Sequence, residues 1–130
     1  MSSDGVTAAR TLLDSMMAGD GAGVMSVLHP DLVVRAAPSL WYGGDHHGPT
    51  AFAEAMGVIA ERVDAKVTDY QVYDCDEVTV VNMRATFTAK ATGRSMEMPI
   101  TEIYRVRDGR IVDMDVYYKD TAALLALLTG

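Results

Sequence analysis

Four stretches of alternating apolar and polar residues follow one another in the second half of the chain, and they constrain the fold more than any other feature. They span about 65–73, 78–90, 95–106 and 110–118, with turn sequences at Asp74-Cys75-Asp76, Thr92-Gly93 and Asp108-Gly109. Connections this short cannot contain the crossovers that parallel strands need. The pattern therefore predicts an antiparallel meander from residue 65 to residue 118.

The first half has helical rather than alternating periodicity. Apolar residues recur at helical spacing from Val6 to Met17, and Gly19-Asp20-Gly21 ends that run. The further predicted elements, in order, are a short helix at 24–28, a strand at 32–37, a glycine-rich loop at 38–48, a helix beginning at Pro49 and a final helix at 121–128 capped by Asp120. Helices first, then a meander, then a closing helix predict the α+β class.

The last hairpin leaves two registers open. A two-residue turn would place Glu102 opposite Asp115, which stacks like charges across the strand pair. A three-residue turn with a bulge at Gly109 would place Glu102 opposite Met114 instead. We favour the bulged register, with Gly109 at positive φ. It places Glu102 on the apolar inner face of the sheet.

The composition of the chain limits the classes of partner that it can bind. The 130 residues fit one domain, 1–130, and the formal net charge of −7 argues against nucleic acid and anionic membrane surfaces as partners. The longest apolar run, 122–128, is too short to span a bilayer, and the first residues lack signal-peptide character. Cys75 is the only cysteine, which favours a cytoplasmic location. There is no phosphate-binding glycine motif.

Several short motifs together resemble a known family. They are Gly19-Asp20 between the first two helices, His29-Pro30-Asp31, Tyr42-Gly43-Gly44, His47-Gly48-Pro49 before the third helix, and the run from Tyr104 to Ile111. In order and spacing, over nearly the whole chain, they resemble the SnoaL-like and ketosteroid-isomerase-like families of the nuclear-transport-factor-2-like superfamily. The resemblance implies a cone-shaped fold, in which a curved antiparallel sheet is wrapped by three N-terminal helices and a short C-terminal helix around an apolar pocket. It also implies a homodimer.

Of the catalytic acids of those families, one carries over to this chain. Ketosteroid isomerases resemble this chain in having an acid at the place of Glu102, but their catalytic base corresponds to Ala36. The aspartates of the similar limonene-epoxide hydrolases correspond to Thr86 and Val116, and SnoaL-like cyclases often carry an aspartate at the place of Val116. Among these positions Glu102 alone is acidic.

Glu102 is the first candidate catalytic residue. A carboxyl group on an apolar face loses hydration, which raises its pKa, so that it can donate a hydrogen bond to an oxyanion or act as a base. The alternative is a structural glutamate that pairs with Arg84 or Arg105.

His46 is the second candidate, as a general base at the mouth of the pocket. Alternation lets only one of His46 and His47 point inward, and the family resemblance favours His46; the alternative is a pair of exposed loop histidines. Adjacent histidines do not readily chelate one ion, and no other His or Cys lies at ligand spacing. We expect neither a metal nor another cofactor.

Eight further side chains are candidates for substrate binding, as aromatic surfaces, hydrogen-bond donors, a cation or an apolar wall. They are Trp41, Tyr42, His47, Arg84, Tyr104, Met114, Val116 and Tyr118. For Trp41 and Tyr42 the alternative is a plug over the core, and the facing of Arg84 stays open. Most of the nine methionines should fill the core, and a few could give the pocket a soft wall.

Two functions follow from these residues. The first is a cofactor-free enzyme of SnoaL-like type that transfers protons on an apolar carbonyl compound, by isomerisation, cyclisation or dehydration. By resemblance, the substrate would be a polyketide- or steroid-like molecule of secondary metabolism. The alternative is a non-catalytic binding protein for a hydrophobic small molecule, since family carboxylates are missing at Ala36, Thr86 and Val116.

Overall fold

One six-stranded sheet organises the molecule, and its strand order is β2-β1-β6-β5-β4-β3. The computed structural model describes residues 3–129, which form four helices and six strands. In chain order these are α1 (Ser3–Ala18), α2 (Gly21–Ser26), β1 (Leu28–Ala36), β2 (Gly44–His47), α3 (Pro49–Arg62), β3 (Val63–Cys75), β4 (Val78–Ala89), β5 (Ser95–Arg107), β6 (Arg110–Tyr118) and α4 (Thr121–Leu128). The predicted α+β class and the antiparallel meander are both confirmed.

Two elements near the start of the sheet differ from the prediction. Strand β1 begins at Leu28 rather than at residue 32, and it pairs in parallel with β6, the last strand of the meander. The predicted loop at 38–48 contains the four-residue strand β2, which pairs antiparallel with β1 from Val33↔His47 to Ala36↔Gly44. A strand of four residues between glycines has too little alternation to be recognised from sequence.

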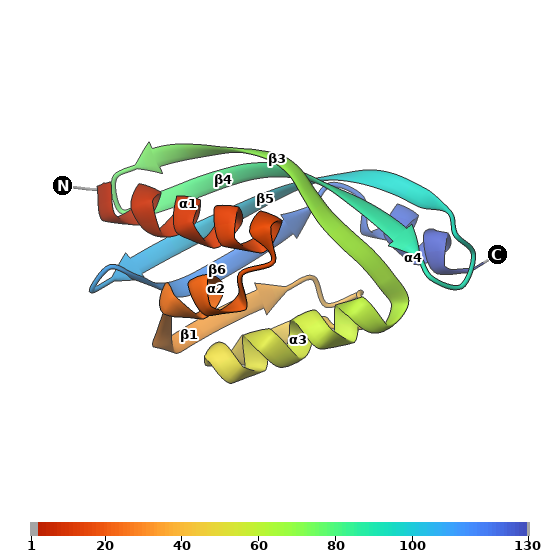
Figure 1. Ribbon diagram of the computed structural model, residues 1–130, viewed down its shortest axis with the longest axis horizontal. Helices are drawn as coiled ribbons and strands as arrows, with labels where there is room; N and C mark the ends of the chain where they lie inside the picture. The colour runs from red at the N-terminus through yellow and green to blue at the C-terminus, as the bar shows by residue number, and fades with distance from the viewer. Residues whose placement is uncertain (1–2, 130) are drawn as a thin grey trace.

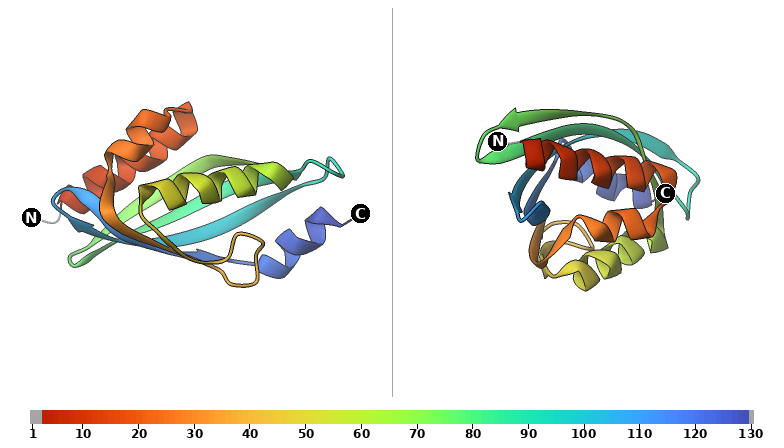
Figure 2. Two further views of the ribbon diagram at one scale, coloured as in Figure 1. Left: turned by 90° about the horizontal axis from the view of Figure 1, so that it is seen from below. Right: turned by 60° about the vertical axis from the view of Figure 1, so that its left-hand side comes forward.

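The sheet is curved, and the first three helices lie in its concave side (Figures 1 and 2). Strand β3 leaves the end of α3 and passes α1 at one edge of the sheet. Helix α4 lies at the end of the molecule opposite the N-terminus and packs on β4 and β5. Asp120 caps it as predicted, since its carboxylate accepts a hydrogen bond from Ala123 N at 2.9 Å.

The core lies between this concave face and α1. Alternate residues of β4, from Val81 through Phe87, are buried against Leu12 and Leu13 of α1. Their neighbours Asn82 and Arg84 are exposed on the other face. The alternation in sequence thus becomes an apolar inner face and a polar outer face.

The last hairpin corrects the predicted register. Asp108 and Gly109 both have positive φ, at 55° and 74°, so they form a two-residue turn with Arg107 opposite Arg110. The extra residue lies within β6: the register shifts between Arg105↔Asp113 and Val106↔Ile111, which leaves Val112 unpaired.

This position of the bulge decides what faces Glu102. Glu102 lies opposite Val116, and Tyr104 lies opposite Met114, two residues from the predicted pairing. The partner predicted for Glu102 was wrong because the bulge is in the strand rather than in the turn. The face was correct, since one extra residue in either place keeps Glu102 and Met114 on the same side of the sheet.

Within residues 3–129, no helix has the length and apolar character needed to cross a bilayer.

Candidate functional site

A small cavity of about 110 Å³ lies between the inner face of the sheet and helices α1 and α3. Its walls are mainly apolar, with Leu12 and Met16 from α1, Phe52 and Met56 from α3, and Phe87 from β4. Among the described residues, four polar side chains line it: Tyr42, His46, Glu102 and Tyr118. A few convergent polar groups in an apolar pocket are typical of small-molecule sites.

Glu102 lies on the wall formed by the meander. On the same face it follows Ile100, and across the strand pairs it meets Val81 and Val116. The hydroxyl of Tyr104 donates a hydrogen bond to Glu102 Oε1. Burial raises the pKa of Glu102 from 4.5 to about 7, and the Tyr104 bond opposes part of this shift. The raised pKa agrees with the prediction for a carboxyl group on an apolar face.

The alternative role for Glu102 was that of a structural glutamate paired with an arginine. Neither of the two arginines predicted as its partner lies on its side of the sheet. Arg84 extends from the outer face of β4, where its guanidinium lies 2.9 Å from Glu97 Oε1. Arg105 is exposed on the outer face of β5, and its strand neighbour on β6 is Asp113. The sheet therefore separates both cations from the Glu102 carboxyl group. Arg84 does not line the cavity, which corrects its predicted place in the pocket.

Tyr42 and Tyr118 form a hydrogen-bonded pair in the cavity wall. The Tyr42 hydroxyl donates to the Tyr118 oxygen at 2.5 Å, and the two rings have centroids 6.4 Å apart. Burial raises the pKa of Tyr118 to about 12, while the bond from Tyr42 lowers it. Burial also raises the pKa of Tyr42. Because Tyr118 accepts from Tyr42, its own proton remains available for a group inside the cavity.

His46 is the histidine that faces inward. It lines the cavity from β2, whereas the adjacent His47 is exposed, as strand alternation requires. His46 Nε2 lies 2.7 Å from the backbone oxygen of Tyr42. A carbonyl oxygen can only accept, so Nε2 carries the proton in this bond and Nδ1 of the neutral ring holds the lone pair. The choice of His46 over His47 as the inward residue is confirmed.

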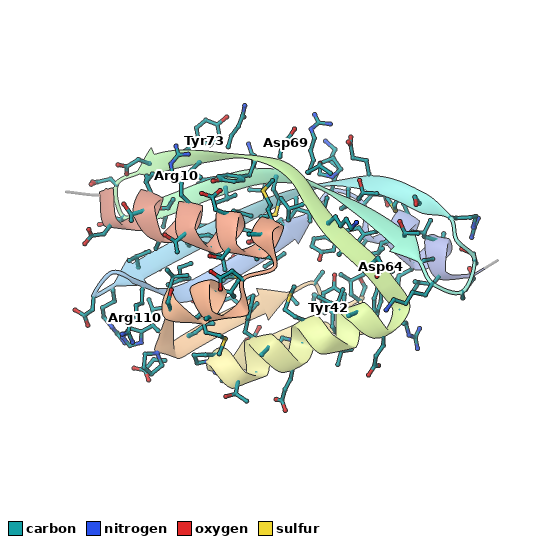
Figure 3. All side chains as sticks on the ribbon, in the orientation of Figure 1. Arg10, Tyr42, Asp64, Asp69, Tyr73 and Arg110 are labelled. Carbon is teal, nitrogen blue, oxygen red and sulfur yellow. The ribbon has the colours of Figure 1, made fainter. Side chains whose placement is uncertain are left out.

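Trp41 covers the core instead of lining the cavity. Its indole Nε1 donates to the backbone oxygen of Val58 at 3.1 Å, and its ring meets Tyr42 edge-on with centroids 4.9 Å apart. The Arg62 guanidinium lies 5.9 Å from the centroid of the indole ring. These contacts attach the loop to α3, so Trp41 acts as a plug behind Tyr42. Figure 3 shows Tyr42 beside α3.

Tyr104 and His47 also lie off the cavity wall. Tyr104 is fully buried and reaches the site only through Glu102, and His47 is on the outside of β2. Of the eight predicted binding residues, Tyr42, Met114, Val116 and Tyr118 do line the cavity. Their role in binding stays a prediction.

The sequence analysis did not assign the helical part of the wall. Leu12, Met16, Phe52, Met56 and Ile59 line the cavity from α1 and α3. Helical periodicity identified them as buried, but it cannot tell a side chain packed against the core from one that borders a void. The expected soft wall of methionines is present, since Met16, Met56, Met83 and Met114 line the cavity.

No cluster of three or more His, Cys, Asp or Glu side chains suited to a metal ion occurs within residues 3–129. A larger groove, of about 710 Å³, crosses the outer side of the sheet past Asn82, Arg84, Thr101 and Lys119. That groove is open and polar, and Glu102 does not line it. The apolar cavity, which brings a desolvated acid together with hydroxyl donors, is therefore the better candidate for chemistry.

The fold has many relatives of known structure. An NTF2-like protein of unknown function from Burkholderia pseudomallei is 21% identical, with a TM-score of 0.88 and 98% of both chains covered. TerC, crystallised with polyporic acid, is 17% identical with a TM-score of 0.88, covering 98% of this chain and 99% of TerC. A candidate polyketide cyclase from Xanthomonas campestris is 18% identical with a TM-score of 0.83, covering 98% of both chains.

A search of curated protein sequences gave no significant match. The SnoaL-like domain family matches residues 9–114, a span that includes most of the cavity wall. The chain therefore shares the fold of these solved structures and belongs to the SnoaL-like domain family.

Proposed function

We propose that the protein is a cofactor-free enzyme that shifts a proton within a small apolar carbonyl compound, with isomerisation as its basic reaction. The observation that carries the proposal is Glu102, a carboxyl group in an apolar cavity with its pKa raised to about 7. Near neutral pH such a group is present in both forms, so it can take a proton in one step and return it in the next.

In the first step the Glu102 carboxylate removes a proton from the carbon next to the substrate carbonyl. The electron pair of the broken C–H bond moves to the carbonyl oxygen and forms an enolate. In the second step the Glu102 carboxylic acid gives the same proton to a different carbon, and the carbonyl is restored. Cyclisation or dehydration would begin with the same enolate.

The role we propose for Tyr118 is to stabilise that enolate. It lines the cavity with Glu102, and its hydroxyl accepts the proton of Tyr42, which makes its own proton a better donor. A donor aimed at the developing oxyanion in a site that excludes water is worth about 2.7–4 kcal/mol of barrier. His46 also lines the cavity, and with Nε2 donating to the Tyr42 carbonyl oxygen its Nδ1 can accept a proton in a step that Glu102 cannot reach.

The relatives support a small-molecule function at the level of the family. One neighbour was crystallised with polyporic acid, and others are described as candidate polyketide cyclases. Their low identity to this chain leaves the nature of the substrate to experiment.

The test is the conversion of 3-cyclohexen-1-one into its conjugated isomer, followed by ultraviolet absorbance. We expect the wild-type protein to accelerate it and Glu102→Gln to lose about 100-fold or more of that activity, since general acid–base groups contribute about 10²–10⁴. Tyr118→Phe should lose about 10²-fold by removing the oxyanion donor.

Glu97→Gln is the matched control, because it makes the same change on the same strand at an exposed position of the outer face. Full activity in Glu102→Gln would rule out Glu102 as the proton carrier. Saturable binding of the enone without turnover by the wild type would favour the alternative, a binding protein.

We also propose that two copies associate through the outer face of the sheet, where Ile103 is half-buried and Tyr117 is 54% exposed. Light scattering at micromolar concentration should give the mass of a dimer, and Tyr117→Asp should shift it toward the monomer. A monomeric mass for the wild type would refute this assembly. A cytoplasmic location remains a prediction from the lone, exposed Cys75.

A further inference from the structure

We propose that the substrate is an elongated molecule that occupies two adjoining hollows. Its compact carbonyl-bearing head fills the Glu102 cavity, and the rest lies in a groove between the α1–α2 connection, α3 and β3. The inference rests on the proposed function for the position of the head, and it adds a second binding region and a shape for the substrate.

The volume of the cavity is the first argument. Pockets that bind drug-sized ligands commonly measure about 300–1,000 Å³, and a cavity of about 150 Å³ holds one benzene ring. The Glu102 cavity, at about 110 Å³, is smaller than the one that holds benzene, so it suits a compact head such as an acetyl group and leaves an attached ring to the junction. The neighbouring groove measures about 670 Å³, and the two hollows together reach the size range of ordinary ligand sites.

The second argument is that the two hollows share walls. Met16, Met56, Ala65 and Val67 line both of them, so these four side chains form the junction. From the junction the groove runs along the end of α1 and the turn into α2. In Figure 1 the end of α1, the short α2 and α3 lie on the same side of the sheet, and β3 runs from α3 toward α1. Because β3 is an edge strand, the groove passes the rim of the sheet and does not cross it.

The outer-face groove does not offer the same route, although Met83, Ile100 and Tyr118 border both it and the cavity. These residues lie within the continuous ladder that pairs Met83 with Ile100 and Arg84 with Pro99. The hydrogen-bonded sheet therefore separates the outer groove from the cavity. A ligand anchored at Glu102 can extend toward the junction at the edge of β3.

The lining of the groove describes the extended part of the ligand. Close to the junction it is apolar, with Met17, which is 49% exposed, and Val24. Its polar residues include Asp20, which caps α2 through Gly23 N at 3.0 Å, and Lys66, which makes no ion pair among residues 3–129. The groove thus suits a flat or chain-like apolar extension with polar substituents near Lys66.

The methionines allow a direct test, because single residues report on each region. Met114 lines the cavity only, Met16 and Met56 line the junction, and Met17 lines the groove only. Met96 borders neither hollow and serves as the control. Protein labelled with ¹³C at its methionine methyl groups is titrated with acetophenone, a single-ring ketone, and with 4-acetylbiphenyl, which adds a second ring.

We expect acetophenone to shift the Met114 methyl resonance and to leave Met17 unchanged. The longer ketone should shift Met114, Met16, Met56 and Met17, and bind about tenfold more tightly. The variant Ala65→Phe narrows the junction, so it should abolish that tenfold advantage. The control Ala53→Phe places the same ring on an exposed residue of α3 that lines neither hollow.

The outcomes separate the two proposals. If 4-acetylbiphenyl shifts Met114 but not Met17, or binds no more tightly than acetophenone, the two-hollow site is refuted and the function proposed for Glu102 stands. If neither ketone shifts Met114, the carbonyl head does not enter the cavity and both proposals fail. Retention of the tenfold advantage in Ala65→Phe would likewise overturn the route through the junction.

Discussion

Two glutamates on one strand show how different the two faces of the sheet are. Glu97 lies on the outer face of β5, where it is exposed and pairs with Arg84 at 2.9 Å. Glu102, five residues later, is on the inner face among apolar side chains, with its pKa raised to about 7. Strand geometry alone separates them, because successive side chains point to opposite sides. The chemistry of this protein therefore depends on which face a residue occupies more than on which residue it is.

The largest expected effect compares neighbours on β4. Phe87 is buried, with its ring centroid 5.8 Å from that of Tyr118, and Thr86 is on the outer face. Phe87→Ala should lower the free energy of unfolding by about 3–5 kcal/mol, and Thr86→Ala should change it by about 0.5 kcal/mol or less. Urea unfolding measures both. Equal effects would show that the two faces are not as distinct as the burial indicates.

A second expected effect is a pH dependence that belongs to Glu102. Its pKa is higher in the folded protein than in the unfolded chain, so between pH 4.5 and 7 the unfolded chain releases the proton first. The free energy of unfolding therefore falls as pH rises through this window, by about 3 kcal/mol from this group. Glu102→Gln should remove that dependence.

The measurement is urea unfolding at pH 4.5 and pH 8 for the wild type, Glu102→Gln and Glu97→Gln. The free energy of unfolding of Glu102→Gln relative to that of the wild type should rise from pH 4.5 to pH 8. Glu97→Gln should follow the wild-type pH dependence, with a constant difference in the free energy of unfolding of about 1 kcal/mol or less. A stability difference that is the same at both pH values would mean that Glu102 titrates normally.

The smallest expected effect concerns Tyr104, which is buried beneath Glu102. Its hydroxyl donates to Oε1 and thereby favours the ionised carboxylate. Tyr104→Phe removes that donor, so the pKa of Glu102 should rise above about 7. Carboxyl ¹³C chemical shifts followed against pH give the value directly. A pKa that falls in this variant would contradict the inferred direction of the hydrogen bond.

The sequence predicted the fold well because the signals for it are local and repeated. The four alternating runs gave the meander, Pro49 gave the start of α3, and Asp120 gave the cap of α4. The short strand β2 was missed, since four residues between glycines carry too little alternation to be recognised. The inward position of Glu102 followed from alternation in the same way, whereas the choice of His46 over His47 came from the family resemblance.

The rest of the candidate site depends on spatial relations that the pattern does not contain. The hydrogen bond between Tyr42 and Tyr118 joins residues 76 positions apart, and no periodicity in either segment indicates it. Trp41 was expected in the pocket because an aromatic residue in a loop suits a ring-shaped ligand, but its hydrogen bond to Val58 turns it toward α3. Arg84 was left open by the turn at Thr92-Gly93, and the ladder places it on the outer face.

The unpaired Val112 has a consequence for how this chain tolerates changes in length. In a regular strand, the loss of one amino acid turns every later side chain to the opposite face. Here the ladder passes directly from Ile111 to Asp113 on the side of β5, with Val112 as the surplus. A one-codon deletion at Val112 would restore a regular hairpin and leave Met114, Val116 and Tyr118 facing the cavity. The same deletion at Ile103 would turn one end of β5 over and move Glu102 or its neighbours to the outer face. A one-residue deletion is thus tolerated in β6 and disruptive in β5.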